Sequence, residues 1–387
     1  MAEIEIGLGK SGRRAYGFDD IAIVPSRRTR DPQDVDISWQ IDAYRFELPL
    51  MASAMDGVVS PATAIEIGRL GGVGVLNLEG LWTRYEDADS VLVEIAGLPV
   101  ENATRRMQEL YQQPIIPGLV TERIREINDA GVVSCAAVTP QRTAALLDHI
   151  LAGELDMLVI QGTVVSAEHV SKTIEPLNLK TFIRQLDIPV IVGGCATNKA
   201  ALHLMRTGAA GVLVGVGPGH ACTTRGVLGL GVPQATAIAD VRAARMRHLD
   251  ETGIYCHVIA DGGMATGGDI SKAIVCGADA VMIGSPLAAA AEAPGRGYHW
   301  GMATFHPTLP RGARVHTGTR GTLKEVLLGP ANENDGKLNL CGGLRTSMAT
   351  CGYVDVKEFQ KAEVMVAPAL MTEGKALQKS QGVGMGH

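Results

Sequence analysis

The stretch GVGPGHACTTRG, residues 215–226, carries one cysteine and two threonines in a glycine-rich loop directly after the apolar run AAGVLV. A cysteine of a hydrophobic core is normally flanked by apolar residues, whereas Cys222 lies between GPGH and TTRG. We therefore interpret Cys222 as a nucleophile that reacts as its thiolate, with a small buried residue beside a tight turn as the alternative. Loop N–H groups, His220 and Arg225 could stabilise this thiolate, although His220 could also be an ordinary exposed loop histidine.

Two other loops, IADGGM and MIGSP, suit a phosphorylated ligand. Backbone N–H groups of Gly263, Gly284 and Ser285 could surround phosphate oxygens. Asp261 ends an apolar run and could accept hydrogen bonds from the vicinal hydroxyls of a ribose, or it could cap the helix that follows. The cysteine loop itself has neither the Lys-Ser/Thr ending of a P-loop nor the spacing of a dinucleotide-binding G-x-G-x-x-G motif.

These loops each follow a short apolar run of the kind that forms a strand buried on both faces. Helical patterns separate most of the runs, and several of the helices end in glycine. Eight such runs occur: PLMASA (49–54), VGVLN (73–77), VSCAAV (133–138), MLVIQ (157–161), IPVIVG (188–193), AGVLVG (210–215), CHVIAD (256–261) and DAVMIG (279–284).

Eight alternating strand and helix units over about 240 residues predict an α/β fold, a (β/α)8 TIM barrel, rather than an open sheet. The active site of such a barrel lies at the C-terminal ends of its strands, so the cysteine loop and the two phosphate-type loops are expected to meet there. We predict an N-terminal arm at 1–48, the barrel core at 49–295, a mobile loop or flap at 296–341, and a C-terminal helix and tail at 342–387 that complete the single domain.

The composition narrows the classes of protein further. The chain has 387 residues, a formal net charge of −6 and short basic runs only, so we expect no nucleic-acid partner. No apolar run is long enough to span a membrane and the start does not resemble a signal peptide, which predicts a cytoplasmic protein with no membrane partner. Seven cysteines without metal-ligand spacing are expected to be free thiols, and Cys135 and Cys276 to be inert core residues.

The loops together resemble the family of inosine monophosphate (IMP) dehydrogenases and guanosine monophosphate (GMP) reductases, and the chain is identified as a member of it. The resemblance extends over nearly the whole chain and is carried by motifs at the spacing of the family. These are FDDIAIVPS (18–26), PLMASAMD (49–56), GGVGVLN (71–77), GVGPGHACTTRGVLGLGVPQATAI (215–238), IADGGM (259–264), GADAVMIGSPLAAAAEAPG (277–295) and GGLRTSMATCGY (342–353).

The resemblance implies that Cys222 forms a covalent bond to C2 of a purine nucleotide, with Thr224 assisting proton transfer beside it. It implies that Asp261 binds the ribose. The other residues that it assigns to the substrate, GMP or IMP, are Ser53, Gly263, Gly284, Ser285, Gly301 and Met302.

The resemblance also implies a nicotinamide dinucleotide and a monovalent cation, with potassium as the candidate ion. The carbonyls of Gly217, Gly219 and Cys222 match the cation loop of the family. The family is usually tetrameric or octameric, which implies a homo-oligomer. The residues expected on the side of the dinucleotide are Gln161, Gly162, Thr163, Gly193 and Gly194.

Two reactions occur in this family, and both pass through a thioimidate on the cysteine. The dehydrogenase oxidises IMP with NAD and then hydrolyses the adduct, whereas the reductase releases ammonia from GMP and reduces the adduct with NADPH. Full-length dehydrogenases typically carry regulatory CBS (Bateman) modules between the second and third strands, where this chain has about fifty residues. Residues 296–321 also have no counterpart of the water-activating Arg-Tyr pair of the dehydrogenase. The sequence therefore favours an NADPH-dependent GMP reductase in a divergent dehydrogenase-like subgroup, with IMP dehydrogenase as the alternative.

Several departures from the family keep further alternatives open. His220 replaces a usual serine and could meet the phosphate by charge. The GMSSE segment of the reductase becomes GMATF, which removes the expected glutamate, and Glu292 aligns with a different one. Gln161 and Cys195 replace the usual aspartate and asparagine on the cofactor side. A non-catalytic regulatory paralogue that binds purine nucleotides and a flavin-dependent barrel oxidoreductase are the remaining interpretations.

Overall fold

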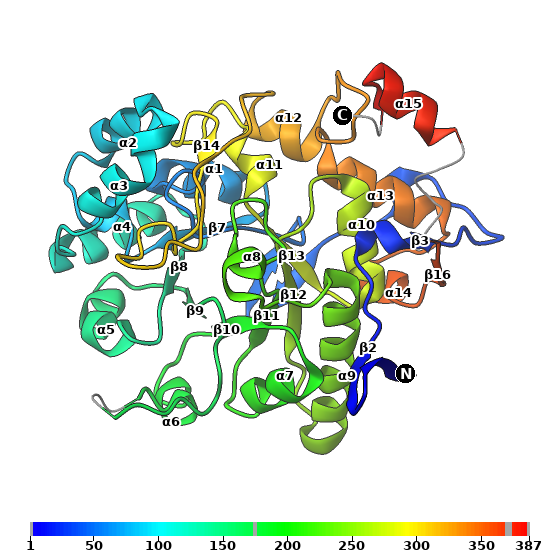
Figure 1. Ribbon diagram of the computed structural model, residues 1–387, viewed down its shortest axis with the longest axis horizontal. Helices are drawn as coiled ribbons and strands as arrows, with labels where there is room; N and C mark the ends of the chain where they lie inside the picture. The colour runs from blue at the N-terminus through cyan, green and yellow to red at the C-terminus, as the bar shows by residue number, and fades with distance from the viewer. Residues whose placement is uncertain (1–2, 173–175, 368–373, 385–387) are drawn as a thin grey trace.

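The computed structural model describes residues 3–172, 176–367 and 374–384, and its centre is a closed parallel barrel (Figure 1). Each strand pairs in parallel with its neighbours, and the last strand pairs with the first. The (β/α)8 prediction is confirmed, and every predicted run overlaps one barrel strand, although β10 extends two residues beyond its run. The strands are β6 (Leu50–Ala52), β7 (Val73–Asn77), β8 (Cys135–Val138), β9 (Met157–Gln161), β10 (Val190–Cys195), β11 (Gly211–Val214), β12 (His257–Asp261) and β13 (Ala280–Ile283).

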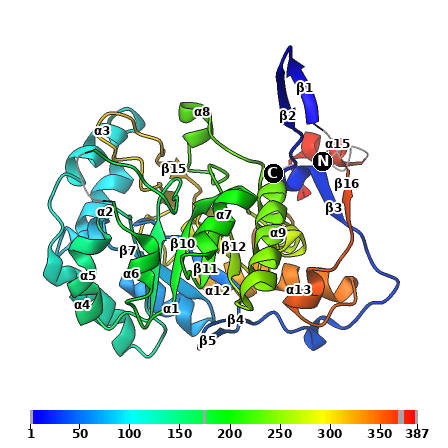
Figure 2. The same ribbon diagram turned by 90° about the horizontal axis from the view of Figure 1, so that it is seen from below.

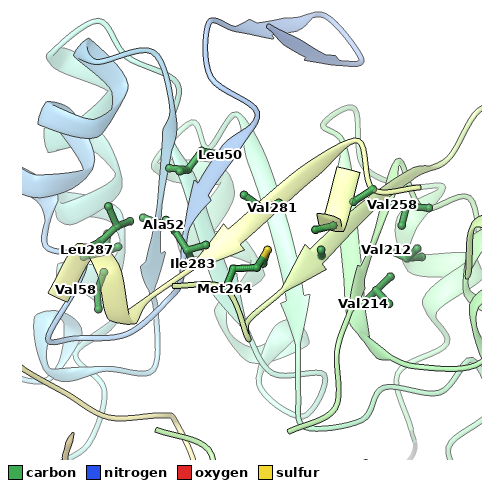
Figure 3. Close-up of a cluster of buried hydrophobic side chains, with 14 of the residues drawn as sticks. Leu50, Ala52, Val58, Val212, Val214, Val258, Met264, Val281, Ile283 and Leu287 are labelled. Atoms are coloured by element: carbon green, nitrogen blue, oxygen red, sulfur yellow. The ribbon is translucent and has the colours of Figure 1, made fainter. Parts of the chain in front are cut away.

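Alternate residues of these strands form two separate apolar clusters. One set, with Val75, Leu213 and Met282 among its members, fills the barrel interior. The other set faces the helices, as Figure 3 shows for Val212, Val258 and other side chains. Burial on both faces explains why the strands appear in the sequence as continuous apolar runs rather than as an alternating pattern.

Helices separate the strands and cover the barrel. They begin at local caps; Ser60, for example, accepts a hydrogen bond from the Thr63 N–H and starts the first of them. The eighth position is filled late in the chain by α13 (Leu340–Thr350), which packs against α10. The other barrel helices are α1 (Pro61–Arg69), α4 (Pro117–Asp129), α5 (Thr143–Ala152), α6 (Leu179–Ile183), α7 (Asn198–Met205), α9 (Gln234–Thr252) and α10 (Gly267–Cys276).

The long excursion between β7 and β8 adds two helices before α4. They are α2 (Ala88–Gly97) and α3 (Val100–Leu110), which follow a short 3-10 turn at Leu81–Thr83. These helices lie together at one end of the molecule (Figure 1). Two short helices also follow barrel strands on the side of the site, α8 (Thr224–Leu228) and α11 (Ser285–Ala288).

The N-terminal arm and the C-terminal tail pack on each other rather than forming separate units. The strand β3 (Ile21–Ile23) of the arm pairs with β16 (Val364–Val366) of the tail. A hairpin of β4 (Trp39–Ile41) and β5 (Tyr44–Phe46) closes the N-terminal end of the barrel interior. A second hairpin, β1 (Glu3–Gly7) with β2 (Lys10–Arg13), projects away from the body (Figure 2). Short helices complete these segments: η1 (Phe18–Asp20), η2 (Pro32–Asp34), α14 (Val356–Phe359) and α15 (Lys375–Gln381).

The flap, residues 296–341, contains more regular structure than the predicted loop. It holds a short antiparallel pair, β14 (Tyr298–His299) with β15 (Val315–His316), and the helix α12 (Leu323–Leu328). The side chain of Glu292 fixes the start of α12 by accepting the Leu323 N–H at 2.8 Å. The second half of the flap is therefore part of the packed domain.

A buried ionic network ties the C-terminal helices to the bottom of the barrel. Asp279 is fully buried and accepts hydrogen bonds from Arg245 at 2.9 Å, Lys357 at 2.7 Å, Tyr255 at 2.7 Å and Gln360 at 2.9 Å. Burial alone would raise the pKa of Asp279, but the charges of Arg245 and Lys357 hold it well below its usual value. This network links α9, β13 and α14 through one carboxylate.

Candidate active site

The predicted nucleophile lies on a loop that follows β11 at the C-terminal end of the barrel. Cys222 is half-buried, and its Sγ lies 3.1 Å from the Oγ1 of Thr224, the first residue of α8. The Cys222 N–H donates to the Gly219 carbonyl at 3.0 Å, which turns the loop back on itself. A hydroxyl at this distance can donate to a thiolate or accept the proton of a thiol. The arrangement gives Cys222 and Thr224 the contact that the predicted roles require.

The flap lies directly on the cysteine loop. Cys222 and Gly312 form an antiparallel bridge, in which the Thr223 N–H donates to the Arg311 carbonyl at 2.8 Å and the Ala313 N–H to the Ala221 carbonyl at 2.9 Å. The backbone of the flap therefore covers the nucleophile.

A cavity of about 940 Å³ opens at this end of the barrel and brings most of the predicted site residues together. Its volume lies within the range of cavities that hold small ligands and cofactors. The predicted residues that line it are Ser53, Gln161, Gly162, Thr163, Gly217, Gly219, Cys222, Thr224, Asp261, Gly263, Gly284, Ser285, Gly301 and Met302. Their individual roles stay predictions.

Two residues predicted on the cofactor side have a different place. Gly193 and Gly194 belong to the strand β10 and are buried against Leu213 and Gly215. They bond to Gly162 instead, since the Gly162 N–H donates to the Gly193 carbonyl at 2.8 Å and the Gly194 N–H to the Gly162 carbonyl at 3.0 Å. In this structure they position Gly162 rather than line the cavity.

Asp261 ends β12 at the floor of the cavity, and its carboxylate accepts the Gln161 Nε2–H at 3.2 Å. The helix that follows is capped by Thr266 and Asp269, so the interpretation of Asp261 as a helix cap is wrong. Burial raises the pKa of Asp261 to about 7, and the hydrogen bond from Gln161 offsets only part of this shift. Burial therefore disfavours the ionised form of Asp261 when Gln161 is its one side-chain donor within the described residues. Further donors, such as ribose hydroxyls, would stabilise the carboxylate.

Because of this shift, we expect the free energy of unfolding of the protein without ligand to depend on pH. A carboxyl group whose pKa is higher in the folded state stabilises the fold at low pH, and this contribution is lost as the pH rises from about 4 through about 7. The variant Asp261→Asn cannot ionise, so its free energy of unfolding should gain on that of the wild type between pH 5 and pH 8. Urea unfolding at both pH values measures the gain, and Asp250→Asn, at an exposed position of α9, is the control. An equal difference from wild type at both pH values would contradict the argument.

The two phosphate-type loops meet the cysteine loop on the other side of the cavity. A Cβ at Gly263, whose φ is +80°, would lie 3.0 Å from Pro218 of the cysteine loop, and one at Gly284 would lie 2.7 Å from the Sδ of Met55. Only glycine allows this close packing. The Oγ of Ser285 lies 2.8 Å from the Nε2 of His299, a fully buried residue of β14.

The inserted helix α3 holds the first half of the flap in place. Tyr111, which caps α3, donates its hydroxyl proton to Asp56 and accepts the Trp300 Nε1–H at 2.8 Å. Its ring stacks on Phe305, with centroids 4.0 Å apart and planes at 7°. Burial raises the pKa of Asp56 to about 6, although the hydrogen bond from Tyr111 lowers it. This cluster joins the loop after β6 to the flap beside Gly301.

The cavity extends past Gln161 to the loops after β7 and β8. Glu79 is buried there and accepts hydrogen bonds from the N–H and hydroxyl of Thr139 at 2.9 and 3.1 Å. Arg142 lies 3.8 Å from the same carboxylate, and Arg84 donates to the Glu79 carbonyl at 3.0 Å. This polar end of the cavity lies beyond the residues predicted for the substrate.

The cavity residues that were not predicted from the sequence include Glu79, Thr139, His299 and Phe305. Glu79 and Thr139 were open to prediction, because each follows the end of a barrel strand by one or two residues and such positions face the site. His299 and Phe305 gave no such signal, because they belong to a loop with no periodic pattern. Their place depends on how the flap folds back on the barrel.

The predicted cation loop is present, although its occupancy stays a prediction. Gly217 has a φ of 74°, a conformation that favours glycine. The Gly219 carbonyl already accepts the Cys222 N–H, which occupies one of its two lone pairs. Within residues 3–172, 176–367 and 374–384, no cluster of three or more His, Cys, Asp or Glu side chains is arranged to hold a metal ion.

The fold and cavity define a (β/α)8 barrel with a cysteine at the mouth and glycine loops beside it. The sequence profile described as "IMP dehydrogenase / GMP reductase domain" matches residues 15–376, so the chain belongs to this family of oxidoreductases.

Related proteins extend this result. An uncharacterized oxidoreductase of Mycobacterium tuberculosis is 53% identical over 372 residues, which cover 94% of this chain and 99% of the relative. An inosine-5'-monophosphate dehydrogenase of Methanocaldococcus jannaschii is 27% identical, with 93% and 94% of the two chains covered. The crystal structure of an IMP dehydrogenase/GMP reductase-like protein from Corynebacterium glutamicum has a TM-score of 0.90 and 46% identity, and covers 94% of this chain and 97% of that one.

None of the helices in the described part of the chain is long and apolar enough to cross a membrane.

Proposed function

We propose that the protein oxidises or reduces C2 of a purine nucleoside 5'-monophosphate through a thioimidate on Cys222. The observation that carries this proposal is the contact of Cys222 with Thr224 in the cavity that Asp261, Gly263 and Ser285 also line. The thiolate attacks C2, and the Thr224 hydroxyl, 3.1 Å from the sulfur, can hydrogen-bond to the thiolate and pass a proton beside it.

The same cavity can hold the rest of the nucleotide. Asp261 accepts hydrogen bonds from the ribose hydroxyls, and the N–H groups of Gly263, Gly284 and Ser285 surround the phosphate. Gly301 and Met302, next to the Trp300 anchor, lie against the base. The docked flap excludes bulk water from the reacting carbon.

The residues beyond the substrate positions fit a nicotinamide dinucleotide. The Oε1 atom of Gln161 is buried at the cavity wall and has no hydrogen-bond partner within the described residues, so it can accept an N–H from a carboxamide. Gly162 and Thr163 continue this wall toward Glu79. When bound, the dinucleotide accepts a hydride from C2 or donates one to it.

The two directions of this chemistry need different groups, and we propose IMP oxidation with NAD as the direction that the geometry supports better. The sequence favours GMP reduction because no tyrosine adjoins an arginine in the flap. The structure adds Arg311, which lines the cavity and whose backbone carbonyl accepts the Thr223 N–H of the cysteine loop. We assign to its guanidinium the positioning of the water that hydrolyses the adduct. Phe305 also occupies the segment where the reductase has its glutamate, and a phenyl ring cannot move a proton to departing ammonia. The relatives with an assigned activity that we compared are named IMP dehydrogenases.

GMP reduction with NADPH is the second candidate. Tyr298 packs on the guanidinium of Arg314 at 4.5 Å, and Arg314 donates to backbone carbonyls of α2 and the residue after it, so this pair is not free to activate water. Phe305 also lines the cavity, and an apolar ring in place of a proton-accepting side chain would favour protection of an adduct from hydrolysis.

A direct assay separates the two. The purified protein is mixed with IMP and NAD, and separately with GMP and NADPH, while nicotinamide absorbance is followed. Absorbance that rises only in the first mixture supports the dehydrogenase, and absorbance that falls only in the second supports the reductase. Nucleotide binding with no change in either mixture would overturn the proposal in favour of a non-catalytic purine-nucleotide-binding paralogue.

The role of Arg311 has its own test. In the dehydrogenase the Arg311→Gln variant should still release a first equivalent of NADH in a burst, because hydride transfer precedes hydrolysis. Its steady-state kcat should fall about 10²-fold or more, because hydrolysis of the adduct loses the donor that positions the attacking water. Stopped-flow absorbance measures both phases, with Arg296→Gln as the matched flap control. A burst that is lost together with kcat would contradict a role limited to hydrolysis.

Potassium binding by the carbonyls of Gly217, Gly219 and Cys222 and assembly into a homo-tetramer or octamer are further parts of this proposal. The β1–β2 hairpin supports assembly, because a two-stranded hairpin is not stable alone and this one exposes Ile4, Ile6 and Leu8. Light scattering of the intact protein measures the oligomer number.

A further inference from the structure

Two histidines lie together at the phosphate end of the cavity. His220 comes from the cysteine loop and His299 from the flap, and their ring centroids are 5.8 Å apart. Both line the cavity. His299 is fully buried, and its Nε2 lies 2.8 Å from the Oγ of Ser285. Its Nδ1 is buried as well and has no hydrogen-bond partner within the described residues. A buried ring nitrogen without a partner is unusual and points to a missing ligand.

The basic groups of the cavity are divided between its ends. Arg84 and Arg142 gather around Glu79 at the cofactor end, and Arg311 is joined to the cysteine loop through its backbone. The two histidines are the basic side chains beside Ser285. A third histidine, His306, also lines the cavity, but its Nδ1 accepts the backbone N–H groups of Thr308 and Leu309 within the flap. A phosphate monoester carries nearly two negative charges at neutral pH, and the backbone N–H groups of glycine loops supply only dipoles.

His299 is uncharged in the empty cavity at neutral pH. Burial lowers its pKa to about 4, and the charge of His220 adds to this effect. A dianion next to the ring would raise the pKa of His299, because an opposite charge within a few ångströms favours the protonated form. The change needs no rearrangement, since Ser285 already fixes the ring through Nε2.

We propose that His299 takes up a proton from solvent when the phosphate group of the nucleotide enters the cavity, so that binding of a nucleoside monophosphate is coupled to protonation of this one ring. This inference rests on the proposed function, because it assigns the phosphate to the loops at Gly263, Gly284 and Ser285. It makes His299 a specificity residue that favours the phosphorylated ligand over the free nucleoside. Binding then weakens as the pH rises.

Other titratable groups surround His299 and contribute protons of their own. Asp261 is the most important, because ribose hydroxyls that donate to its carboxylate would lower its pKa from about 7 and release a proton. The total proton count of binding is therefore a sum over several groups. The titratable and charged side chains on the elements packed around His299 are His220 of the cysteine loop, Asp56 of the loop after β6, Asp261 of β12, and Tyr298, Arg314 and His316 of the β14–β15 hairpin.

A difference between variants isolates the contribution of His299. The variant His299→Asn keeps a donor near the Nδ1 position but cannot titrate, and His299→Gln instead reaches the Nε2 position. His316→Asn, at an exposed position of the paired strand β15, is the matched control. Binding of IMP without any dinucleotide is followed by titration calorimetry at pH 7.5 in two buffers of different ionisation enthalpy, which gives the protons taken up per nucleotide.

The wild type and the His316 variant should take up at least about half a proton more than either His299 variant, because the shares of Asp261 and of the phosphate cancel in the difference. Between the pKa of the free ring, about 4, and the higher pKa of the bound ring, the ratio of the wild-type Kd to that of the His299 variants should rise about tenfold per pH unit, and it should become constant above the pKa of the bound ring.

Equal proton uptake in the wild type and the His299 variants would overturn the inference and leave the proposed function intact. Failure of the wild type to bind IMP at any pH would overturn both.

Discussion

The variant Cys222→Ala should lose turnover by about 10³-fold or more in either direction of the reaction, because both directions pass through the bond between sulfur and C2. Its affinity for the nucleotide should change little. The predicted ribose and phosphate contacts come from Asp261, Gly263, Gly284 and Ser285, which belong to other loops. Nicotinamide absorbance measures the first quantity and titration calorimetry the second.

The matched control is Cys276→Ala, since Cys276 is a free thiol near the end of α10 and away from the cavity. Burial raises the pKa of its thiol to about 12, which makes it a poor nucleophile. This variant should keep wild-type kcat. A Cys222 variant with turnover near that of the wild type would refute the covalent route, and a Cys222 variant that no longer binds nucleotide would mean that the thiol also shapes the loop.

The second large effect is expected on stability. The variant Asp279→Ala should lower the free energy of unfolding by about 3–5 kcal/mol, because it leaves the guanidinium of Arg245 buried without its counter-ion. It also removes the acceptor for Lys357, Tyr255 and Gln360. Urea unfolding monitored by tryptophan fluorescence measures the loss.

Asp240→Ala is the surface counterpart of this change. Asp240 also pairs with an arginine, Arg13, at 2.7 Å, but the Arg13 side chain is 46% exposed and water can replace the lost partner. Its loss should be much smaller than that at Asp279. Similar losses for the two variants would show that burial of the Asp279 network does not set its contribution.

The strands of the barrel were predictable from the sequence because of how they are buried. Each is covered on both faces, so runs such as MLVIQ and DAVMIG stand out between helices that end in glycine. The barrel then fixes where the loops lie, because the C-terminal ends of all eight parallel strands are at the same end of the barrel. This geometry is why Cys222 and Asp261, 39 positions apart in the chain, could be assigned to one site.

The flap could not be predicted in the same way. Its position depends on pairing with the cysteine loop at Gly312 and on the contacts of Tyr111 with Trp300 and Phe305. These contacts join segments about 90 to 190 residues apart and leave no periodic pattern in the sequence. The sequence therefore suggested a mobile loop where the structure has a docked segment, and it gave no sign of His299 behind Ser285.

Gly193 and Gly194 illustrate a related limit. Their run GGC reads as a glycine loop after a strand, whereas the structure continues β10 through Cys195. Glycine occurs there because a side chain would collide with Leu213 and Gly215, where a Cβ would approach to about 2.5 Å. A glycine that serves close backbone packing and one that surrounds a ligand look the same in a single sequence.

The most direct test of the account is to capture the adduct itself. The protein is incubated with IMP and NAD, quenched in acid during steady turnover and digested, and the peptides are analysed by mass spectrometry. The account predicts that the peptide containing Cys222 carries the mass of the nucleotide less two hydrogens, in wild type and at higher occupancy in Arg311→Gln. With GMP and NADPH as the working pair, loss of ammonia from GMP gives an adduct of the same mass, because both reactions pass through the same thioimidate. Turnover in either mixture with Cys222 unmodified throughout would contradict the central claim.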